Sequence, residues 1–267
     1  DLRPAMIHLD SLGLREKRNE NNNKLVLCSE LSVTRLTLLD NCPREFYLRN
    51  MLKIDDSELQ MPTLTDSGAN LKKDVMSSTA ERGTYVHEQL SNAIMRNLTA
   101  SLKVAEESIV DDKTLDNMNW VLDELKVFKS KNYNLISEKA VKFSLFGQMI
   151  SGTPDLVLEG TNKEELEIWD FKTGAYSEEK CRPYWLQLKV YALGLQEGQS
   201  ANSKDCASVI MKLVFVDQRK IVTKKMNLSD IEDDIFVLWN KLEDLDKINE
   251  AHCPKCIYQE LCFSHVN

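Results

Sequence analysis

Two stretches that contain runs of apolar residues, joined by a polar turn, predict a pair of strands and give the clearest pattern in the chain. The first lies around residues 150–158, and the second is Leu166–Lys172, with the sequence LEIWDFK. Because successive side chains of a strand point to opposite faces, we expect Asp170 and Lys172 to share one face at the end of the second strand. If the two strands pair as a hairpin, Asp155 lies close to both side chains.

Hydrophobic periodicity predicts further elements on either side of this hairpin. We expect helices over residues 32–52, 81–97, 114–131, 183–196 and from 229 to near 249, and strands over residues 135–146, 207–216 and 221–228. In the first helix Thr34 is the candidate N-cap, and Pro43 is expected to break or kink the helix. Pro183 should begin the fourth helix, and Ser229 with Glu232 is placed to cap the fifth.

The order of these elements predicts an α/β fold with a central mixed β-sheet flanked by helices. Residues 1–31 are assigned to a tail or linker and residues 32–267 to the folded domain, and the polar segment 55–78 is expected to be a loop. No stretch is long and apolar enough to predict a membrane span. The chain begins with Asp1 rather than Met, which favours excision from a longer polypeptide.

Composition is that of an ordinary folded protein, with 267 residues, 42% of them apolar and 28% charged. The formal net charge is −8 and the isoelectric point about 5.2. This balance argues against a protein that binds nucleic acid through bulk positive charge. Any basic track for DNA would have to be local.

The residues Asp155, Asp170 and Lys172 carry the main candidate chemistry. Two carboxylates and a lysine at a strand end can hold a hard divalent cation and activate a water. The plain alternative is a surface acid in a turn and an exposed Asp/Lys pair, since Asp-x-Lys is a common sequence. Apolar strand residues precede both acids, however, and an acid buried at each strand end needs a partner such as a cation.

The cysteines indicate a second metal site. There are seven, and three of them form the spacing C-x₂-C-x₅-C near the end of the chain. An odd number crowded in this way fits a metal site in a reducing compartment, such as the cytoplasm, better than a disulfide framework. Three cysteines need a fourth ligand: zinc could take His252 or His265, whereas a 4Fe–4S cluster takes four thiolates.

Five motifs follow one another in a fixed order along the chain: Gly83-Thr-Tyr-Val-His87, Gly152-Thr-Pro-Asp155, Asp170-Phe-Lys172, Gln187-Leu-Lys-Val-Tyr191, and the cysteines Cys253, Cys256 and Cys262 together with the early Cys42. Over about residues 32 to 262, this set resembles the PD-(D/E)xK nuclease superfamily. More narrowly, it resembles the branch shared by the RecB and AddB nuclease domains and the CRISPR-associated nucleases with an iron–sulfur cluster.

The resemblance implies a restriction-endonuclease-like core and a deoxyribonuclease that depends on Mg²⁺ or Mn²⁺. Asp155, Asp170 and His87 would hold the metal, and imidazole suits Mn²⁺ better than Mg²⁺. Lys172 would position the attacking water or stabilise charge on the phosphoryl oxygens, while Gln187 and Tyr191 would place the DNA backbone. A glutamate often occupies about the place of Glu138, and Tyr184 and Trp185 could either stack on bases or pack in the core.

The resemblance also implies that Cys42, Cys253, Cys256 and Cys262 hold a 4Fe–4S cluster, which acts as a clasp between the N-terminal helix and the C-terminal tail. The expected activity is exonuclease-type cleavage of single-stranded DNA. Two contexts stay open: the nuclease module of a helicase–nuclease in double-strand break repair, with a helicase domain or subunit as partner, and a stand-alone CRISPR-adaptation nuclease, both in a bacterial-type cell. A non-catalytic domain that binds DNA or a partner subunit is the alternative from another class.

Overall fold

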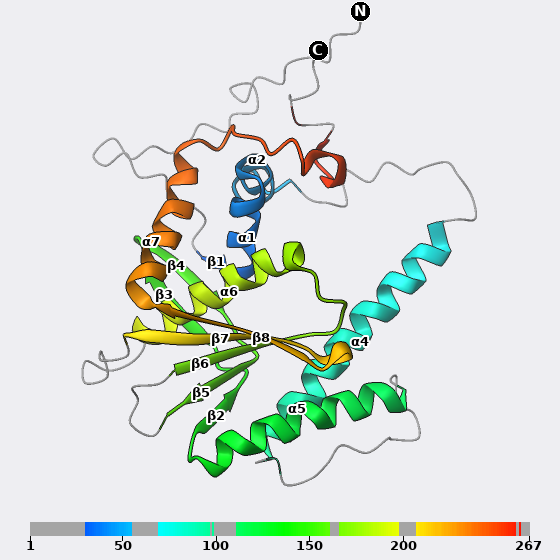
Figure 1. The fold of residues 1–267 in the computed structure, drawn as a ribbon. Helices are drawn as coiled ribbons and strands as arrows, with labels where there is room; N and C mark the ends of the chain where they lie inside the picture. Colours follow the sequence, from blue (N-terminus) through cyan, green and yellow to red (C-terminus); the bar gives the residue numbers. More distant parts are fainter. Residues whose placement is uncertain are drawn as a thin grey trace, which may run out of the picture.

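Figure 1 shows a central β-sheet with helices on both faces, as the sequence predicts. The computed structural model describes residues 30–54, 69–96, 98, 111–160, 166–197, 207–259 and 262. Nearly all of the predicted tail, residues 55–68 of the predicted loop, and His265 lie outside the described residues. Among the helices that the structure describes, none is both long and apolar enough to cross a lipid bilayer.

The central sheet has five strands in the order β2-β5-β6-β7-β8. β6 and β7 run parallel, and the other neighbours are antiparallel, so the sheet is mixed as expected. The pairing of β5 with β6 confirms the predicted hairpin, and the predicted strands over residues 207–216 and 221–228 pair with each other as β7 and β8. The strands are β2 (Asn134–Ser137), β5 (Leu156–Glu159), β6 (Leu166–Lys172), β7 (Ser208–Phe215) and β8 (Lys220–Asn227).

A second, three-stranded sheet has the order β1-β4-β3, formed by β1 (Leu31–Ser32), β4 (Gln148–Gly152) and β3 (Val141–Leu145). The strand predicted over residues 135–146 and the one predicted around 150–158 are therefore each two strands, in different sheets. Glu138 separates the first pair with φ 52°, a conformation that ends an extended strand. Pro154 lies between β4 and β5, where it cannot donate to a strand ladder.

Two layers of helix cover the central sheet. One face packs against α4 (Ala69–Met95) and α5 (Asp112–Ser130) through a core that includes Trp169 and Phe171. The other face packs against α6 (Glu178–Glu197), with α1 (Val33–Asn41) and α7 (Leu228–Trp239) joining the same core. Figure 1 shows α4 and α5 together on one side of the sheet, opposite α6.

The first predicted helix is broken at Pro43, as expected. α1 ends at Asn41, and α2 (Pro43–Phe46) continues into a π-helical turn over Tyr47–Met51. The predicted cap is wrong: Ser32, rather than Thr34, accepts a hydrogen bond from the N–H of Arg35, at 3.3 Å.

Three further helices differ from prediction at their ends. α4 begins at Ala69 rather than near Glu81, so part of the predicted loop is helical. α6 begins at Glu178 and has Pro183 inside it rather than at its start. α7 is capped by Asn227, which leaves Ser229 inside the helix, and it ends at Trp239 before a 3₁₀ turn instead of continuing to 249. Local cap patterns are weak where tertiary packing decides the end of a helix.

The close approach of α6 to β3 depends on Gly194. A Cβ atom at this position would lie 2.4 Å from Cε1 of Phe143. We expect Gly194→Val to lower the free energy of unfolding by about 1–3 kcal/mol, because overpacking displaces the buried ring. Urea denaturation, with unchanged m-value, measures this loss. The matched control is Gly174→Ala, whose Cβ would meet no atom within 4 Å; an equal loss in both variants would contradict the packing argument.

Candidate functional site

The candidate site lies where β5 begins and β6 ends. Leu166 and Ile168 of β6 belong to the core against α6, and Trp169 and Phe171 belong to the core against α4 and α5. The alternation predicted from the sequence is thus confirmed, and Asp170 shares the α6 face with its strand neighbours at even positions. Asp155 directly precedes β5, which pairs with β6.

Two side-chain pairs form the centre of the site. The Nδ1 atom of His87, which comes from α4, lies 3.2 Å from Oδ1 of Asp155. The other Asp155 oxygen accepts a hydrogen bond from the backbone N–H of Phe171 at 2.7 Å, which ties this side chain to β6. The ammonium group of Lys172 lies 2.7 Å from Oδ2 of Asp170. The structure therefore gathers the predicted catalytic residues and His87 as two pairs at one end of the sheet.

Asp170 has the chemistry of an incomplete cation site. Its side chain is 9% exposed, and in the described part of the chain the ammonium group of Lys172 is the one partner of its buried Oδ2 atom, at 2.7 Å. The ammonium group of Lys172 lies beside that oxygen but leaves acceptor capacity unused. Carboxylate oxygens together with an imidazole suit Mg²⁺ or Mn²⁺, so the residues present fit a divalent cation.

Burial and mutual repulsion control the protonation of the site. Burial raises the pKa of Asp170 to about 6, and the charge of Asp155 raises it while Lys172 acts in the opposite direction. Burial and then Asp155 also raise the pKa of Glu138. Although burial favours neutral imidazole, the bond to Asp155 raises the pKa of His87. The charge of Asp155 thus raises the pKa of both Asp170 and Glu138, and a bound cation would relieve this repulsion.

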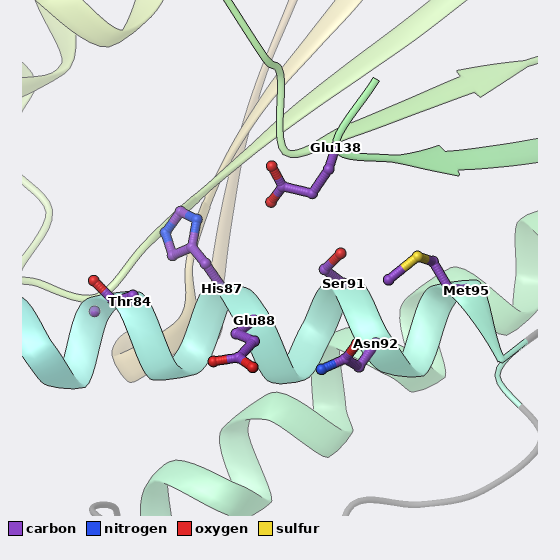
Figure 2. Close-up of a pocket in the computed structure, with 8 residues that line it drawn as sticks. Thr84, His87, Glu88, Ser91, Asn92, Met95 and Glu138 are labelled. Atoms are coloured by element: carbon purple, nitrogen blue, oxygen red, sulfur yellow. The ribbon is translucent and has the colours of Figure 1, made fainter. Parts of the chain in front are cut away.

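Glu138 joins the site although the strand pattern gave no reason to place it there. Figure 2 shows its carboxylate and the ring of His87 extending into the same space above α4. Both residues line a hollow of about 570 Å³ together with Ser91 and Met95. The N–H of Glu138 donates to the backbone carbonyl of Asp155 at 3.1 Å, which ties the turn after β2 to the start of β5. The resemblance to a known family was the one indication of this residue in the sequence.

Gln187 and Tyr191 lie one turn apart on α6, and the structure places them differently. Tyr191 is buried, and its hydroxyl group is bonded to the backbone of Thr153. Its ring fills the space beside Gly152, where an added Cβ would lie 2.8 Å from Cε1 of Tyr191. Burial raises the pKa of this tyrosine to about 12. Tyr191 therefore supports the segment that leads to Asp155, while Gln187 is half-buried on the same helix.

A second hollow, of about 220 Å³, lies on the other side of His87. It is lined by residues that follow Lys172 along the chain and by the first half of α6, including Lys180 and Tyr184. The ammonium group of Lys172 lies 4.5 Å from the centre of the Tyr184 ring. This contact shows that Tyr184 faces the site rather than packing only in the core.

Three of the four cysteines of the second predicted site lie where two distant segments meet. These segments are the α1–α2 corner (residues 41–54), with Cys42, and the tail segment (residues 247–258), with Cys253 and Cys256, which lie side by side in Figure 1. Cys262 follows the tail segment, and its backbone N–H donates to Tyr258 O at 3.0 Å. Direct bonds join them: Arg44 N–H to Lys247 O at 3.1 Å, Asn249 Nδ2 to Asn41 O at 2.9 Å, His252 Nε2 with Glu45 Oε2 at 2.6 Å, and Tyr258 OH to Ile54 O at 2.9 Å. The clasp between the N- and C-terminal parts thus exists as protein contacts.

Cys42 and Cys253 are buried at this junction, and Cys256 and Cys262 are half-buried. Burial raises the pKa of Cys256 to about 11, and the charges of Glu45, Cys42 and Cys262 raise it as well. Cys42 and Cys262 thus lie close enough to Cys256 to act on it electrostatically, as the ligands of one cluster would. In the described part of the chain, three ligand atoms come within 4.8 Å of one another only at Glu45, His252 and Cys256, a set that would suit a single transition-metal ion.

Comparison with known proteins gives one informative match. Residues 30–263 match the family model of the PD-(D/E)XK nuclease superfamily. No curated protein matches the sequence. Among solved structures, one titled "Crystal structure of SSO0001" aligns with 97% of this chain and 98% of its own, at 16% sequence identity and a TM-score of 0.42.

Proposed function

Because the chain belongs to the PD-(D/E)XK nuclease superfamily, we propose that it is a metal-dependent deoxyribonuclease that cleaves single strands. The superfamily's activity is nucleic-acid cleavage with divalent metal ions, and the mixed sheet with flanking helices fits its restriction-endonuclease-like core. The observation that carries the proposal is the buried, hydrogen-bond-poor Oδ2 atom of Asp170, beside Lys172 and close to Asp155 and His87.

Each residue has a role in this proposal. Asp155, Asp170 and His87 hold Mg²⁺ or Mn²⁺, and Glu138 adds a further carboxylate on the His87 side. When bound, such an ion supplies Lewis acidity and lowers the pKa of a bound water. Lys172 donates from its ammonium group to the water or to a phosphoryl oxygen, where charge develops. Tyr191 holds the backbone before Asp155 in place, and Gln187, on the same helix face, contacts the DNA backbone.

The same proposal gives Cys42, Cys253, Cys256 and Cys262 to a 4Fe–4S cluster. What supports it is the meeting of these cysteines at the junction of the α1–α2 corner and the tail segment. The alternative is a zinc ion, for which His252 and Glu45 lie beside Cys256. His252 already bonds to Glu45 through Nε2 and to Asn41 through Nδ1, so a zinc ion would have to replace the first of these bonds.

The biological context is part of the proposal. We favour the nuclease module of a helicase–nuclease that acts in double-strand break repair, over a stand-alone CRISPR-adaptation nuclease. Helicase motifs in the same gene or in its partner subunit would support the first context. A non-catalytic DNA- or partner-binding domain is the alternative from another class, and the complete set of Asp155, Asp170 and Lys172 argues against it.

A cleavage assay with metals tests the proposed activity. Purified protein should degrade end-labelled single-stranded DNA with Mn²⁺ or Mg²⁺ and should be inactive with EDTA. Closed circular single strands distinguish the modes of attack, since an enzyme that requires an end leaves them intact. Absence of cleavage under every metal condition, by a protein that still binds DNA, would favour the non-catalytic alternative.

Metal binding should weaken as the pH falls through about 6. The pKa of Asp170 is raised to about 6, so below this pH the acid is increasingly protonated and cannot ligate a cation. The raised pKa of His87 acts in the same direction, because imidazolium has no free lone pair. Titration of Mn²⁺ followed by electron paramagnetic resonance, between about pH 5 and about pH 8, measures the trend. An affinity that does not change over this range would contradict it.

A further inference from the structure

A row of three lysines leads from the candidate active site to the edge of the central sheet, and each ammonium group lies over an aromatic ring. Lys172 lies 4.5 Å from the ring centre of Tyr184, as described above. Lys220 lies 3.3 Å from that of Tyr176, and Lys224 lies 4.7 Å from that of Trp185. Tyr184 and Trp185 belong to α6, and Tyr176 precedes it.

Strand register places these lysines on one face of the sheet. Lys172 of β6 pairs with Phe215 of β7, which in turn pairs with Lys220 of the edge strand β8. Two strand spacings separate Lys172 from Lys220, about 10 Å, and the four residues from Lys220 to Lys224 span about 13 Å. Phe215 and Val222 both pack in the core on the α6 side, so this face carries Lys220 and Lys224.

Lys220 and Lys224 of β8 have no carboxylate partner in the part of the chain that the structure describes, and both are exposed. Other lysines nearby are neutralised: Lys189 pairs with Asp234, and Lys241 with Asp40. An ammonium group held over a ring keeps its N–H donors available for a second partner. The rings thus position two uncompensated positive charges in a protein whose net charge is −8.

Two separate hollows lie beside the row along α6. The hollow of about 220 Å³ beside Lys172 and Tyr184 lies at one end. A larger hollow, of about 610 Å³, is lined by Tyr176, Trp185 and Lys224 among other residues. Residues of the first half of α6 line both hollows, and α7 residues also line the larger one, where Asp40 and Asp234 are paired with lysines. A ligand therefore finds space beside Lys172 at one end of the row and beside Lys224 at the other.

We propose that this lysine row, Lys172–Lys220–Lys224, binds the sugar–phosphate backbone of the single strand on its way into or out of the active site. The inference deepens the proposed nuclease function and depends on it for the ligand. A local series of cations beside aromatic rings is the general means by which proteins track single-stranded nucleic acid without reading its sequence. It also supplies the local basic track that the acidic composition requires.

DNA binding in EDTA, where cleavage is excluded, tests the row by itself. Lys224→Ala should weaken binding of a fluorescent oligothymidine and make the slope of log affinity against log salt shallower by about 0.7, the value for one single-strand phosphate contact. In the double variant Lys220→Ala/Lys224→Ala, the slope should become shallower by about twice that amount. The matched control is Lys225→Ala, the neighbouring exposed lysine on the opposite face of β8. Equal effects at Lys224 and Lys225, or unchanged slopes, would overturn the proposal.

A cleavage arm separates this inference from the proposed activity. An oligothymidine that is too short to reach from the metal site to Lys220 should be cut equally well by wild type and by the double variant. A long strand at low concentration should be cut more slowly by the double variant. If wild type cuts both substrates and the double variant matches it on each, the row is rejected and the nuclease stands. If wild type cuts neither, the nuclease is rejected, and the binding arm still decides the row.

Discussion

Replacing Asp170 by asparagine should abolish cleavage, with a loss of about 10³-fold or more. An amide cannot supply the negative oxygen that a divalent ion needs, and a loss of about 4 kcal/mol in transition-state stabilisation corresponds to that factor. Lys172→Met should lower the rate by about 10²–10³-fold, the usual cost of one donor aimed at developing charge. Initial rates on labelled single strands, at saturating Mn²⁺, measure both effects.

The fold should survive these substitutions. The raised pKa of Asp170 shows that ionisation is disfavoured at this buried position, so removing the charge by Asp170→Asn should favour the folded state. The same substitution leaves the ammonium group of Lys172 without its carboxylate partner, which should disfavour the folded state. The two effects on stability therefore oppose each other. Circular dichroism and the melting temperature check this. Asp116→Asn is the control, since Asp116 is an exposed acid of α5 paired with Arg219. Full activity in either site variant, or equal loss in the control, would reject the assignment.

Replacing Cys256 by serine should remove the proposed 4Fe–4S cluster and loosen the junction between the tail segment and the α1–α2 corner. Wild-type protein purified without oxygen should be brown and contain about four iron atoms per chain, and the variant should lose both properties. Because metal-binding free energy is also folding free energy, the variant should melt at a lower temperature. Limited proteolysis should then cut first in the tail segment, which the cluster no longer holds against the α1–α2 corner.

Cys181→Ser is the matched control for that experiment. Cys181 is a buried thiol of α6, far in sequence from the tail segment, and its replacement should leave the iron content unchanged. A wild-type protein that contains one zinc ion and no iron would contradict the cluster. Loss of that zinc on substituting His252 or Glu45 would then assign the ion to the trio beside Cys256.

The sequence predicted best those parts whose structure follows from local alternation. β6 has the predicted bounds, because a run of apolar residues with period two is a strong strand pattern. Its hairpin with β5 and the position of Asp170 and Lys172 on one face follow from the same period. The nearness of His87 to Asp155 joins residues from different layers, and only the resemblance to a family anticipated it.

What the sequence did not predict depends on tertiary packing or on backbone conformation. The positive φ of Glu138 divides one apparent strand into two and turns this carboxylate towards His87, and no hydrophobic pattern encodes such a turn. The burial of Tyr191 against Gly152 depends on how closely α6 approaches β4. Likewise, the alignment of Lys172 with Lys220 depends on a register between strands that are distant in sequence.

The junction of the tail segment with the α1–α2 corner also bears on biosynthesis. Chain elongation delivers His87, Asp155, Asp170 and Lys172 well before residues 247–258, and that late segment supplies the partners that Arg44 and Glu45 find in Lys247 and His252. Contacts between residues more than 200 positions apart form slowly. During translation, the residues of the candidate active site are therefore present before residues 247–258 can pack against Glu45. A product that ends before residue 247 contains the candidate active site but lacks the segment that packs there.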